Sequence, residues 1–136
     1  MSVARLAFDA EPASIATVNA WLADARTVYD LPADVVLRLS LVLEELVANV
    51  ATYGGRTPCR IEISLAADRD AVLLTVDDDG VAFDPTSAPA PDVVANIADR
   101  SVGGLGIHLM RNLMDDVRYV RVDGHNRLTL RKGFMR

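Results

Sequence analysis

The sequence predicts a single domain of the α/β class, and three observations support this prediction. The chain has 136 residues, of which 51% are apolar, so it is long enough to bury one core. Residues 33–54 carry apolar side chains at helical spacing, whereas 59–65 and 71–77 alternate at the period of two typical of strands. No internal repeat or linker divides the chain, so we expect one domain over residues 1–136.

Two helices are predicted after a short first strand. Residues 3–8 alternate enough to form an edge strand. Residues 13–26 are predicted to be helical, with an apolar face made of Ile15, Val18, Trp21 and Leu22. In the segment 30–32 an aspartate resembles an N-cap, and a proline suits the first turn of the helix over 33–54. Glycines at 54–55 can end that helix in a left-handed conformation.

Two hairpins are predicted in the rest of the chain. The alternating runs 59–65 and 71–77 are separated by a short polar turn and form the first. Residues 117–122 and 126–130 form the second, around the Asp-Gly-His turn at 123–125.

The helix over 33–54 carries a polar stripe beside its apolar one. Residues three and four apart share a face, which gives a polar stripe of Arg38, Glu45, Asn49 and Thr52. Roughly 130° further round lie Val36, Leu39, Leu43, Leu46 and Val50. Leu41 and Val42 flank the polar stripe, which predicts that it opens into a partly apolar cavity. A carboxylate and a carboxamide one turn apart, Glu45 and Asn49, suit a hard cation and a hydroxyl beside it. Glu44 belongs to neither stripe, and an ordinary amphipathic helix is the alternative interpretation.

The strand over 71–77 leads into three consecutive aspartates. Alternation places Val72, Leu74 and Val76 on one face and carries that face on to Asp78, while Asp77 and Asp79 point the other way. A buried carboxylate at a strand end can accept a hydrogen bond from an exocyclic amine. Adenine offers such an amine, whereas guanine presents a carbonyl oxygen that would repel the carboxylate. A tight turn at Asp78-Asp79-Gly80 is the structural alternative.

A glycine-rich segment precedes a helix predicted over 107–114. Backbone N–H groups in such a segment can approach an anion closely, which makes a phosphate cradle of Gly103, Gly104, Leu105 and Gly106. The pattern is not a P-loop, because the only lysine is Lys132. Arg100 and Arg111 bracket the glycines and are candidate side-chain cations. The preceding residues 84–102 are rich in Pro, Ala, Ser and Asp, with a short helix expected over 92–98, as in a functional or mobile loop.

Composition excludes several functions. A net charge of −5 argues against a nucleic-acid binder. The single cysteine, Cys59, excludes an internal disulfide and is expected to be a small buried hydrophobe. His108 and His125 lie at no zinc spacing. Without a signal peptide or a run of 18 apolar residues, we expect a cytoplasmic protein that does not enter the membrane.

Taken in order, Glu45-x-x-x-Asn49, Asp78-x-Gly80 and Gly104-x-Gly106 resemble the N, G1 and G2 boxes of the GHKL (histidine-kinase-like) ATP-binding superfamily. Two longer segments are most similar to the bacterial anti-sigma-factor serine/threonine kinases. These are Asp79-Gly-x-x-Phe83-Asp-Pro85 and Gly103-Gly-Leu-Gly-Ile-His-Leu-x-Arg111, and the similarity runs from about residue 3 to 132.

This resemblance implies a fold and a ligand. The fold is a two-layer α/β sandwich of the Bergerat type, with helices on one face of a mixed, mostly antiparallel sheet. ATP with Mg²⁺ would bind between sheet and helices under a lid at 86–102. By position, Glu45 would be the general base, Asn49 the magnesium ligand and Asp78 the adenine reader. Gly80 would let the base approach closely, and residues 103–106 would hold the phosphates.

The resemblance also implies partners. The family phosphorylates a serine or threonine on an anti-anti-sigma (STAS-type) protein, binds a sigma factor in competition, and commonly forms homodimers. Two departures stand out. Ala82 replaces the last glycine of the G1 box, where a left-handed backbone would cost about 1 kcal/mol, so the turn differs or nucleotide binding is weaker. In the first helix, Ala16, Thr17 and Asn19 stand where many of these kinases carry an arginine. A non-catalytic ATP-binding regulator and a histidine-kinase catalytic module are the alternatives.

Overall fold

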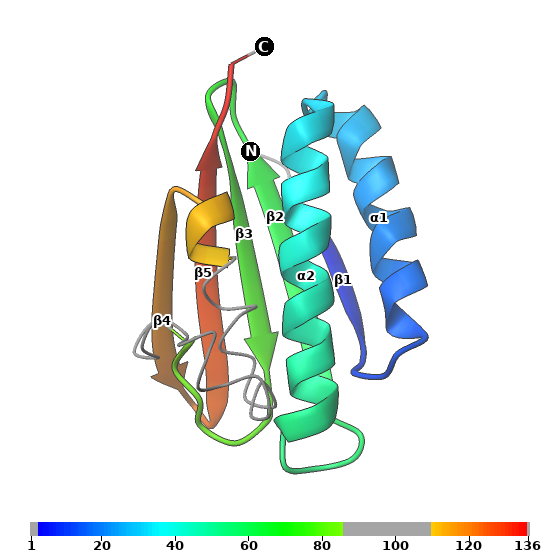
Figure 1. Cartoon of the computed structure of the whole chain (residues 1–136), viewed down its shortest axis with the longest axis vertical. Coiled ribbons are helices and arrows are strands. Elements are labelled where there is room, and N and C mark those ends of the chain that lie inside the picture. The colour runs from blue at the N-terminus through cyan, green and yellow to red at the C-terminus, as the bar shows by residue number, and fades with distance from the viewer. Residues whose placement is uncertain (1–2, 86–109, 136) are drawn as a thin grey trace, which may run out of the picture.

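The computed structural model describes residues 3–85 and 110–135. In chain order the elements are β1 (Ala4–Asp9), α1 (Ser14–Tyr29), α2 (Ala33–Tyr53), β2 (Arg60–Ala67), β3 (Ala71–Asp78), β4 (Asp116–Val122) and β5 (His125–Gly133) (Figure 1). Residues 110–113 add one helical turn before β4. Within these ranges, no helix is both long enough and apolar enough to cross a membrane.

The described strands form one five-stranded sheet in the order β1-β2-β3-β5-β4. All four pairings between them are antiparallel. The described strands therefore do not form the mixed sheet that was expected. The last strand of the chain, β5, therefore lies inside the sheet, and β4 forms its edge. Helices α1 and α2 lie side by side along the sheet (Figure 1). The architecture is the two-layer α/β sandwich that the resemblance implied.

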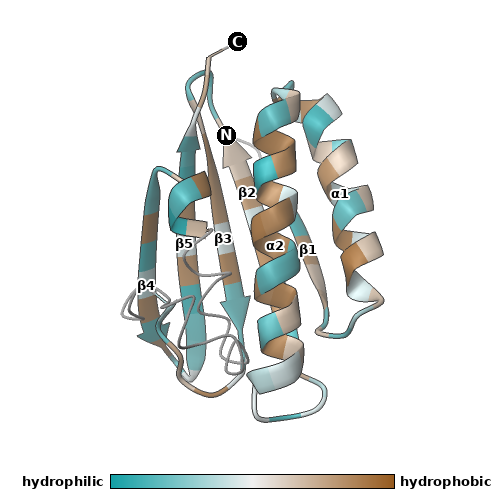
Figure 2. Ribbon diagram, viewed as in Figure 1, coloured by the Kyte–Doolittle hydropathy of each residue, from teal (hydrophilic) through white to brown (hydrophobic). Residues whose placement is uncertain are grey.

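The core lies between α2 and one face of the sheet. Every second residue of the central strands is almost fully buried there: Ile61, Ile63, Leu65, Val72, Leu74, Val76, Leu128 and Leu130. Apolar and polar residues accordingly alternate along these strands in Figure 2. The alternation predicted for both hairpins is confirmed, and the predicted first strand lies at the edge of the sheet.

The buried face of α2 is wider than the predicted apolar stripe. Val35 and Val47 are fully buried although they lie outside that stripe, and Leu46 is only partly buried. Val42, expected beside a polar cavity, is 1% exposed and belongs to the core, so that expectation is wrong for this residue. The reason is that α2 packs against α1 on one side and against the sheet on the other, which buries a wide arc of the helix.

The connection between the helices also differs from the prediction. Asp30 is not an N-cap of α2; it ends α1 in a left-handed conformation with φ 52°, which aspartate tolerates better than most residues. Pro32 occupies the N-cap position, and no side chain in the described ranges caps the helix start. Helix α1 extends three residues beyond the predicted end. At the other end of α2, Gly55 has the predicted left-handed backbone, with φ 80°.

We predict that Leu43→Ala will destabilise the protein by about 2–5 kcal/mol, because it removes three carbon atoms (Cγ, Cδ1 and Cδ2) from a fully packed interior. Leu43 is 0% exposed. Leu37→Ala on the same helix is the matched control, because Leu37 is 60% exposed and should change stability by no more than about 0.5 kcal/mol. Urea unfolding measures both; equal losses would contradict the assigned helix orientation.

Candidate functional site

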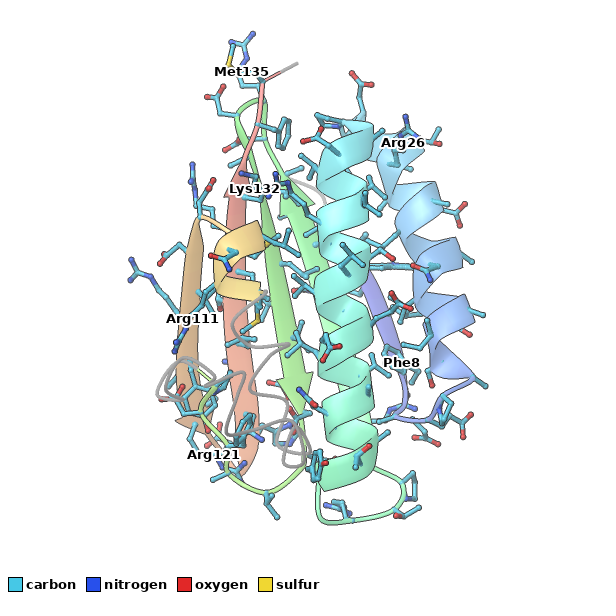
Figure 3. The ribbon with its side chains drawn as sticks, viewed as in Figure 1. Phe8, Arg26, Arg111, Arg121, Lys132 and Met135 are labelled. Carbon is cyan, nitrogen blue, oxygen red and sulfur yellow. The ribbon has the colours of Figure 1, made fainter. Side chains whose placement is uncertain are left out.

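A cavity of about 180 Å³ opens beside the C-terminal half of α2. Its wall comes from α2, the end of β3, the segment after β3, and the β4–β5 hairpin, and it is mostly apolar. The lining residues are Leu46, Asn49, Val50, Tyr53, Gly54, Val76, Asp78, Val81, Ala82, Phe83, Pro85, Tyr119, Asn126 and Leu128. Figure 3 shows this end of the molecule, where Arg121 lies next to the segment that follows β3.

Asp78 is the single carboxylate on the described wall of this cavity. Its Oδ1 accepts two hydrogen bonds, from the backbone N–H of Gly80 at 2.9 Å and from Nδ2 of Asn126 at 2.9 Å. Within the described residues no hydrogen bond reaches Oδ2, and no fully buried side-chain oxygen or nitrogen is left without a partner. Oδ2 is therefore accessible, and the accessible side of Asp78 is the cavity.

Burial raises the pKa of Asp78 above its ordinary value. The hydrogen bonds from Asn126 and Gly80 oppose this shift, and the neighbouring carboxylates Asp77 and Asp79 add to it. The carboxylate is thus a strong acceptor in a largely apolar environment, where a ligand's donor would be worth more than in water.

The two neighbouring aspartates face away from the cavity, as strand alternation predicted. Asp77 lies on the outer face of the sheet, where it pairs with His125 and accepts a hydrogen bond from Arg127 at 3.2 Å. Asp79 Oδ1 accepts a hydrogen bond from the backbone N–H of Arg60 at 2.7 Å. Burial is the largest single effect and raises the pKa of Asp79, but the hydrogen bonds from Arg60 and Cys59 and the nearby Arg56 together outweigh it, so the pKa is lowered overall.

The two predicted helix residues occupy different positions relative to the cavity. Asn49 is on its wall. Glu45, one turn earlier, is half-buried and is not a lining residue, and Glu44 is exposed. In the described part of the chain neither Glu45 nor Asn49 forms a hydrogen bond or ion pair with another side chain. Asn49 is thus available to a ligand in the cavity, whereas Glu45 lies one helical turn before it and outside the cavity lining.

The segment after β3 explains the alanine at position 82. Among described residues other than glycine, positive φ occurs at Asp30 and Asp123 alone, so the backbone of Ala82 is not left-handed. The cost anticipated for a left-handed alanine does not arise. At Gly80 a Cβ would lie 3.0 Å from the carbonyl oxygen of Gly54, so glycine is favoured there by packing within the protein itself.

Cys59 packs behind Gly80 and is the buried, free thiol that the sequence predicted. Burial is the main cause that raises the pKa of this thiol to about 11, with Asp79 adding to the shift. The sulfur is therefore neutral at physiological pH and acts as a packing group.

Sequence reasoning missed Asn126. This residue is 7% exposed and forms four hydrogen bonds, to Asp78, Val81, Phe83 and Tyr119. Its signal was present: the alternation that buries Leu128 and Leu130 also turns position 126 toward the helices. An asparagine at an inward position of a strand requires polar partners.

Several predicted features fall outside the described residues. These are the cradle of Gly103, Gly104, Leu105 and Gly106, together with Arg100, His108, the short helix over 92–98 and the lid at 86–102. Of the helix predicted over 107–114, residues 110–113 are helical.

Two arginines form hydrogen bonds to residues that flank the segment 86–109. Arg38 donates a hydrogen bond from α2 to the carbonyl oxygen of Leu113 at 3.3 Å, which places part of the polar stripe against the last helical turn. Arg111, a candidate phosphate ligand, donates to the carbonyl oxygen of Pro85 at 3.1 Å. Residues 85 and 111 are thereby joined next to the cavity.

The arrangement suits a flat polar ring with an exocyclic donor. Apolar side chains line both sides of the cavity, and Asp78 supplies one free acceptor at its end. At about 180 Å³ the described cavity is smaller than the 300 Å³ or more typical of whole drug-sized ligands, so it would hold a ring and not an entire nucleotide. Asn49 lies on the wall, and its carboxamide has no hydrogen-bond partner among the described residues. A carboxamide oxygen is the kind of ligand that Mg²⁺ accepts beside phosphates. The described residues contain no cluster of three or more His, Cys, Asp or Glu side chains suited to a metal.

We predict that the urea midpoint of unfolding of the Asp78→Asn variant at pH 7 will be equal to or higher than that of the wild-type protein. The raised pKa means that folding disfavours the ionised form of Asp78, so the carboxylate costs stability above that pKa, and this cost disappears as the pH falls through it. The amide still offers Oδ1 to Gly80 and Asn126. The advantage of the variant should therefore shrink as the pH falls.

Asp79→Asn is the control, because its effect on stability at pH 7 should have the opposite sign. The pKa of Asp79 is lowered, so its charge stabilises the fold at pH 7 and this contribution is lost as the pH falls through the lowered pKa. The variant should be less stable than wild type at neutral pH and similar at low pH. The same sign for both variants at pH 7 would contradict the assigned environments.

Comparison with known proteins is consistent with this geometry. Residues 8–132 match the family described as histidine kinase-like ATPase domain. The chain is also 36% identical over 116 residues to the serine/threonine-protein kinase BtrW of Bordetella bronchiseptica, an alignment that covers 85% of this chain and 76% of BtrW. The family match begins at the end of β1 and extends through both helices and into β5, so it includes every residue that lines the cavity. The chain therefore belongs to the family of histidine kinase-like ATPase domains.

Proposed function

We propose that this protein is an ATP-dependent serine/threonine-protein kinase that acts as an anti-sigma regulatory factor in the cytoplasm. It would switch between two partners, a sigma factor and an anti-anti-sigma protein of the STAS type, and work as a homodimer. The observation that carries the nucleotide part of this proposal is the free oxygen of Asp78 at the end of an apolar cavity. The name of the relative BtrW supports the kinase part.

Base recognition rests on Asp78. With Oδ1 held by two donors, Oδ2 is the acceptor available to the exocyclic amine of adenine. Guanine would place its O6 acceptor against the carboxylate, and two acceptors facing each other in an apolar cavity are strongly disfavoured. The site therefore favours adenine nucleotides.

Phosphoryl transfer would use the polar face of α2. ATP supplies the phosphoryl group when bound, and residues 103–106 would hold its phosphates. Asn49 would ligate Mg²⁺ through its carboxamide oxygen. Glu45 would take the proton from the incoming serine hydroxyl as the oxygen–phosphorus bond forms and the bond to ADP breaks. Both side chains lie on one face of one helix, which fixes their separation.

A second function is favoured by one observation. Glu45 does not line the described cavity, whereas Asn49 and Asp78 do. A regulator that binds ATP and sequesters its partner without turnover would need Asn49 and Asp78 but not Glu45.

We predict that the wild-type protein binds ATP and ADP well and GTP poorly, and that Asp78→Asn reverses this preference. In the variant, Oδ1 must still face Gly80 and Asn126, so an NH₂ group replaces Oδ2 and points its hydrogens at the base. The exocyclic amine of adenine then faces another donor, and adenine nucleotides should lose one or more kcal/mol of binding free energy. The carbonyl of guanine, in contrast, gains a hydrogen-bond donor. Isothermal titration with both nucleotides measures the change; equal affinity of the wild type for ATP and GTP would refute adenine recognition by Asp78.

We predict that Glu45→Gln lowers phosphoryl transfer about 10²–10⁴-fold while ATP binding survives, because the amide keeps the shape and loses the basicity. Asn49→Ala should weaken Mg²⁺-dependent ATP binding itself. Glu44→Gln is the matched control, since Glu44 is exposed and should affect transfer little. The assay is incubation with ATP, Mg²⁺ and a STAS-type protein from the same genome, followed by mass spectrometry for phosphoserine or phosphothreonine.

Two outcomes would change this reading. Loss of transfer in Glu44→Gln but not in Glu45→Gln would show that the catalytic face of α2 is misassigned. ATP binding without any transfer by the wild type would favour the sequestering regulator.

A further inference from the structure

Asn126 joins the end of β3 to the segment that forms one wall of the cavity. Its Nδ2 donates to Asp78 Oδ1 at 2.9 Å and to the carbonyl oxygen of Val81 at 2.8 Å. Its Oδ1 accepts from the backbone N–H of Phe83 at 3.1 Å and from the hydroxyl of Tyr119 at 2.6 Å. All four hydrogen-bonding positions of the carboxamide are therefore in use.

The orientation of this carboxamide is fixed by its backbone partners. The N–H of Phe83 can only donate, so it must meet Oδ1, and the carbonyl of Val81 can only accept, so it must meet Nδ2. The remaining hydrogen of Nδ2 then points at Asp78. A flipped amide would break both backbone contacts and turn an acceptor toward the carboxylate.

The same hairpin holds the segment at a second point. Arg121 of β4 donates a hydrogen bond to the carbonyl oxygen of Gly80 at 2.8 Å. The carbonyls of Gly80 and Val81 and the N–H of Phe83 are thus all bound by side chains of the β4–β5 hairpin. These contacts support a turn at Ala82 that has no left-handed residue.

We propose that Asn126 is a positioning residue that determines the preference for adenine. It fixes Oδ1 of Asp78, so that Oδ2 faces the ligand, and it holds residues 81–83 as the wall against which the base packs. This role rests on the proposed binding of adenine nucleotides. Asn126 itself has no hydrogen-bonding capacity left for the base, so it acts through Asp78 and the wall.

Removal of the carboxamide would affect two parts of the site. The carboxylate of Asp78 would lose one of its two restraints and could rotate between several orientations. The backbone groups of Val81 and Phe83 would lose their partners, although water could reach them from the cavity. The contact between Asp78 and the exocyclic amine depends on direction and should suffer more than stacking of the ring.

The decisive comparison is ATP against purine riboside triphosphate, which has the same ring system without the exocyclic amine. Asn126→Ala should lower the affinity for ATP about 10- to 100-fold, the scale of a hydrogen bond to a charged group, and change that for the purine analogue much less. A merely structural residue would lower both affinities by the same factor. Titration calorimetry of wild type and variant with both nucleotides gives the four dissociation constants.

Two further variants control for folding. Asn126→Asp keeps the shape of the side chain but replaces the donor with an acceptor beside Asp78, so its selective loss for ATP should exceed that of Asn126→Ala. Asn19→Ala is the matched control, because Asn19 forms one exposed hydrogen bond with Ser40 between the helices. It should leave both affinities unchanged. Thermal unfolding of each variant shows whether it is folded, and Asn126→Asp alone carries the test if Asn126→Ala is not.

The outcomes separate this inference from the proposed function. If wild type prefers ATP over the purine analogue and both variants at position 126 keep that preference, the positioning role is overturned while adenine recognition stands. An equal loss for both nucleotides also overturns it, in favour of a structural role. If wild type itself shows no preference, adenine recognition by Asp78 fails and the positioning role fails with it.

Discussion

The packing of α2 against one face of the sheet is the constraint on which the rest of the structure depends. Strand β3 buries Val72, Leu74 and Val76 under the helix, and the period of two then turns Asp78 toward the same side. A carboxylate at the border of an apolar core is unfavourable unless it is hydrogen-bonded. The position of the site and its electrostatics are both consequences of that core.

Strand β5, which pairs between β3 and β4, supplies the hydrogen-bond donor that the partly buried carboxylate of Asp78 needs. Asn126 is the direct neighbour of Asp78 in the ladder and also faces inward, so its carboxamide reaches the carboxylate at 2.9 Å. Because the amide has two donors and two acceptor positions, the same side chain binds the segment after β3 and Tyr119. A fully satisfied network of this kind is rigid, and its rigidity leaves Oδ2 of Asp78 as the free acceptor in the cavity.

Helix α2 carries its structural and its candidate ligand-binding residues on different faces. Its wide apolar arc packs against α1 and the sheet, while the half-buried Asn49 and Glu45 lie outside the fully buried set, and of these two Asn49 lines the cavity. Since a helix is rigid, burial of the arc fixes the direction of both polar side chains. Arg38, from the same polar stripe, is used differently: it binds Leu113 and so ties the turn at 110–113 to α2. One stripe thus combines candidate ligand residues with a structural contact.

Much of the fold and part of the site could be predicted from the sequence, because they depend on local periodicity. Alternation identified the strands and selected Asp78 over Asp77 and Asp79, and helical spacing placed Glu45 and Asn49 on one face. Features that need distant segments were not predictable in this way: the extent of the buried arc that includes Val42, and the order of the strands. The role of Asn126 belongs to this second group. Its inward direction is local, but its partners Asp78, Val81 and Phe83 lie more than 40 residues earlier in the chain, and only the pairing of β3 with β5 brings them within hydrogen-bonding distance.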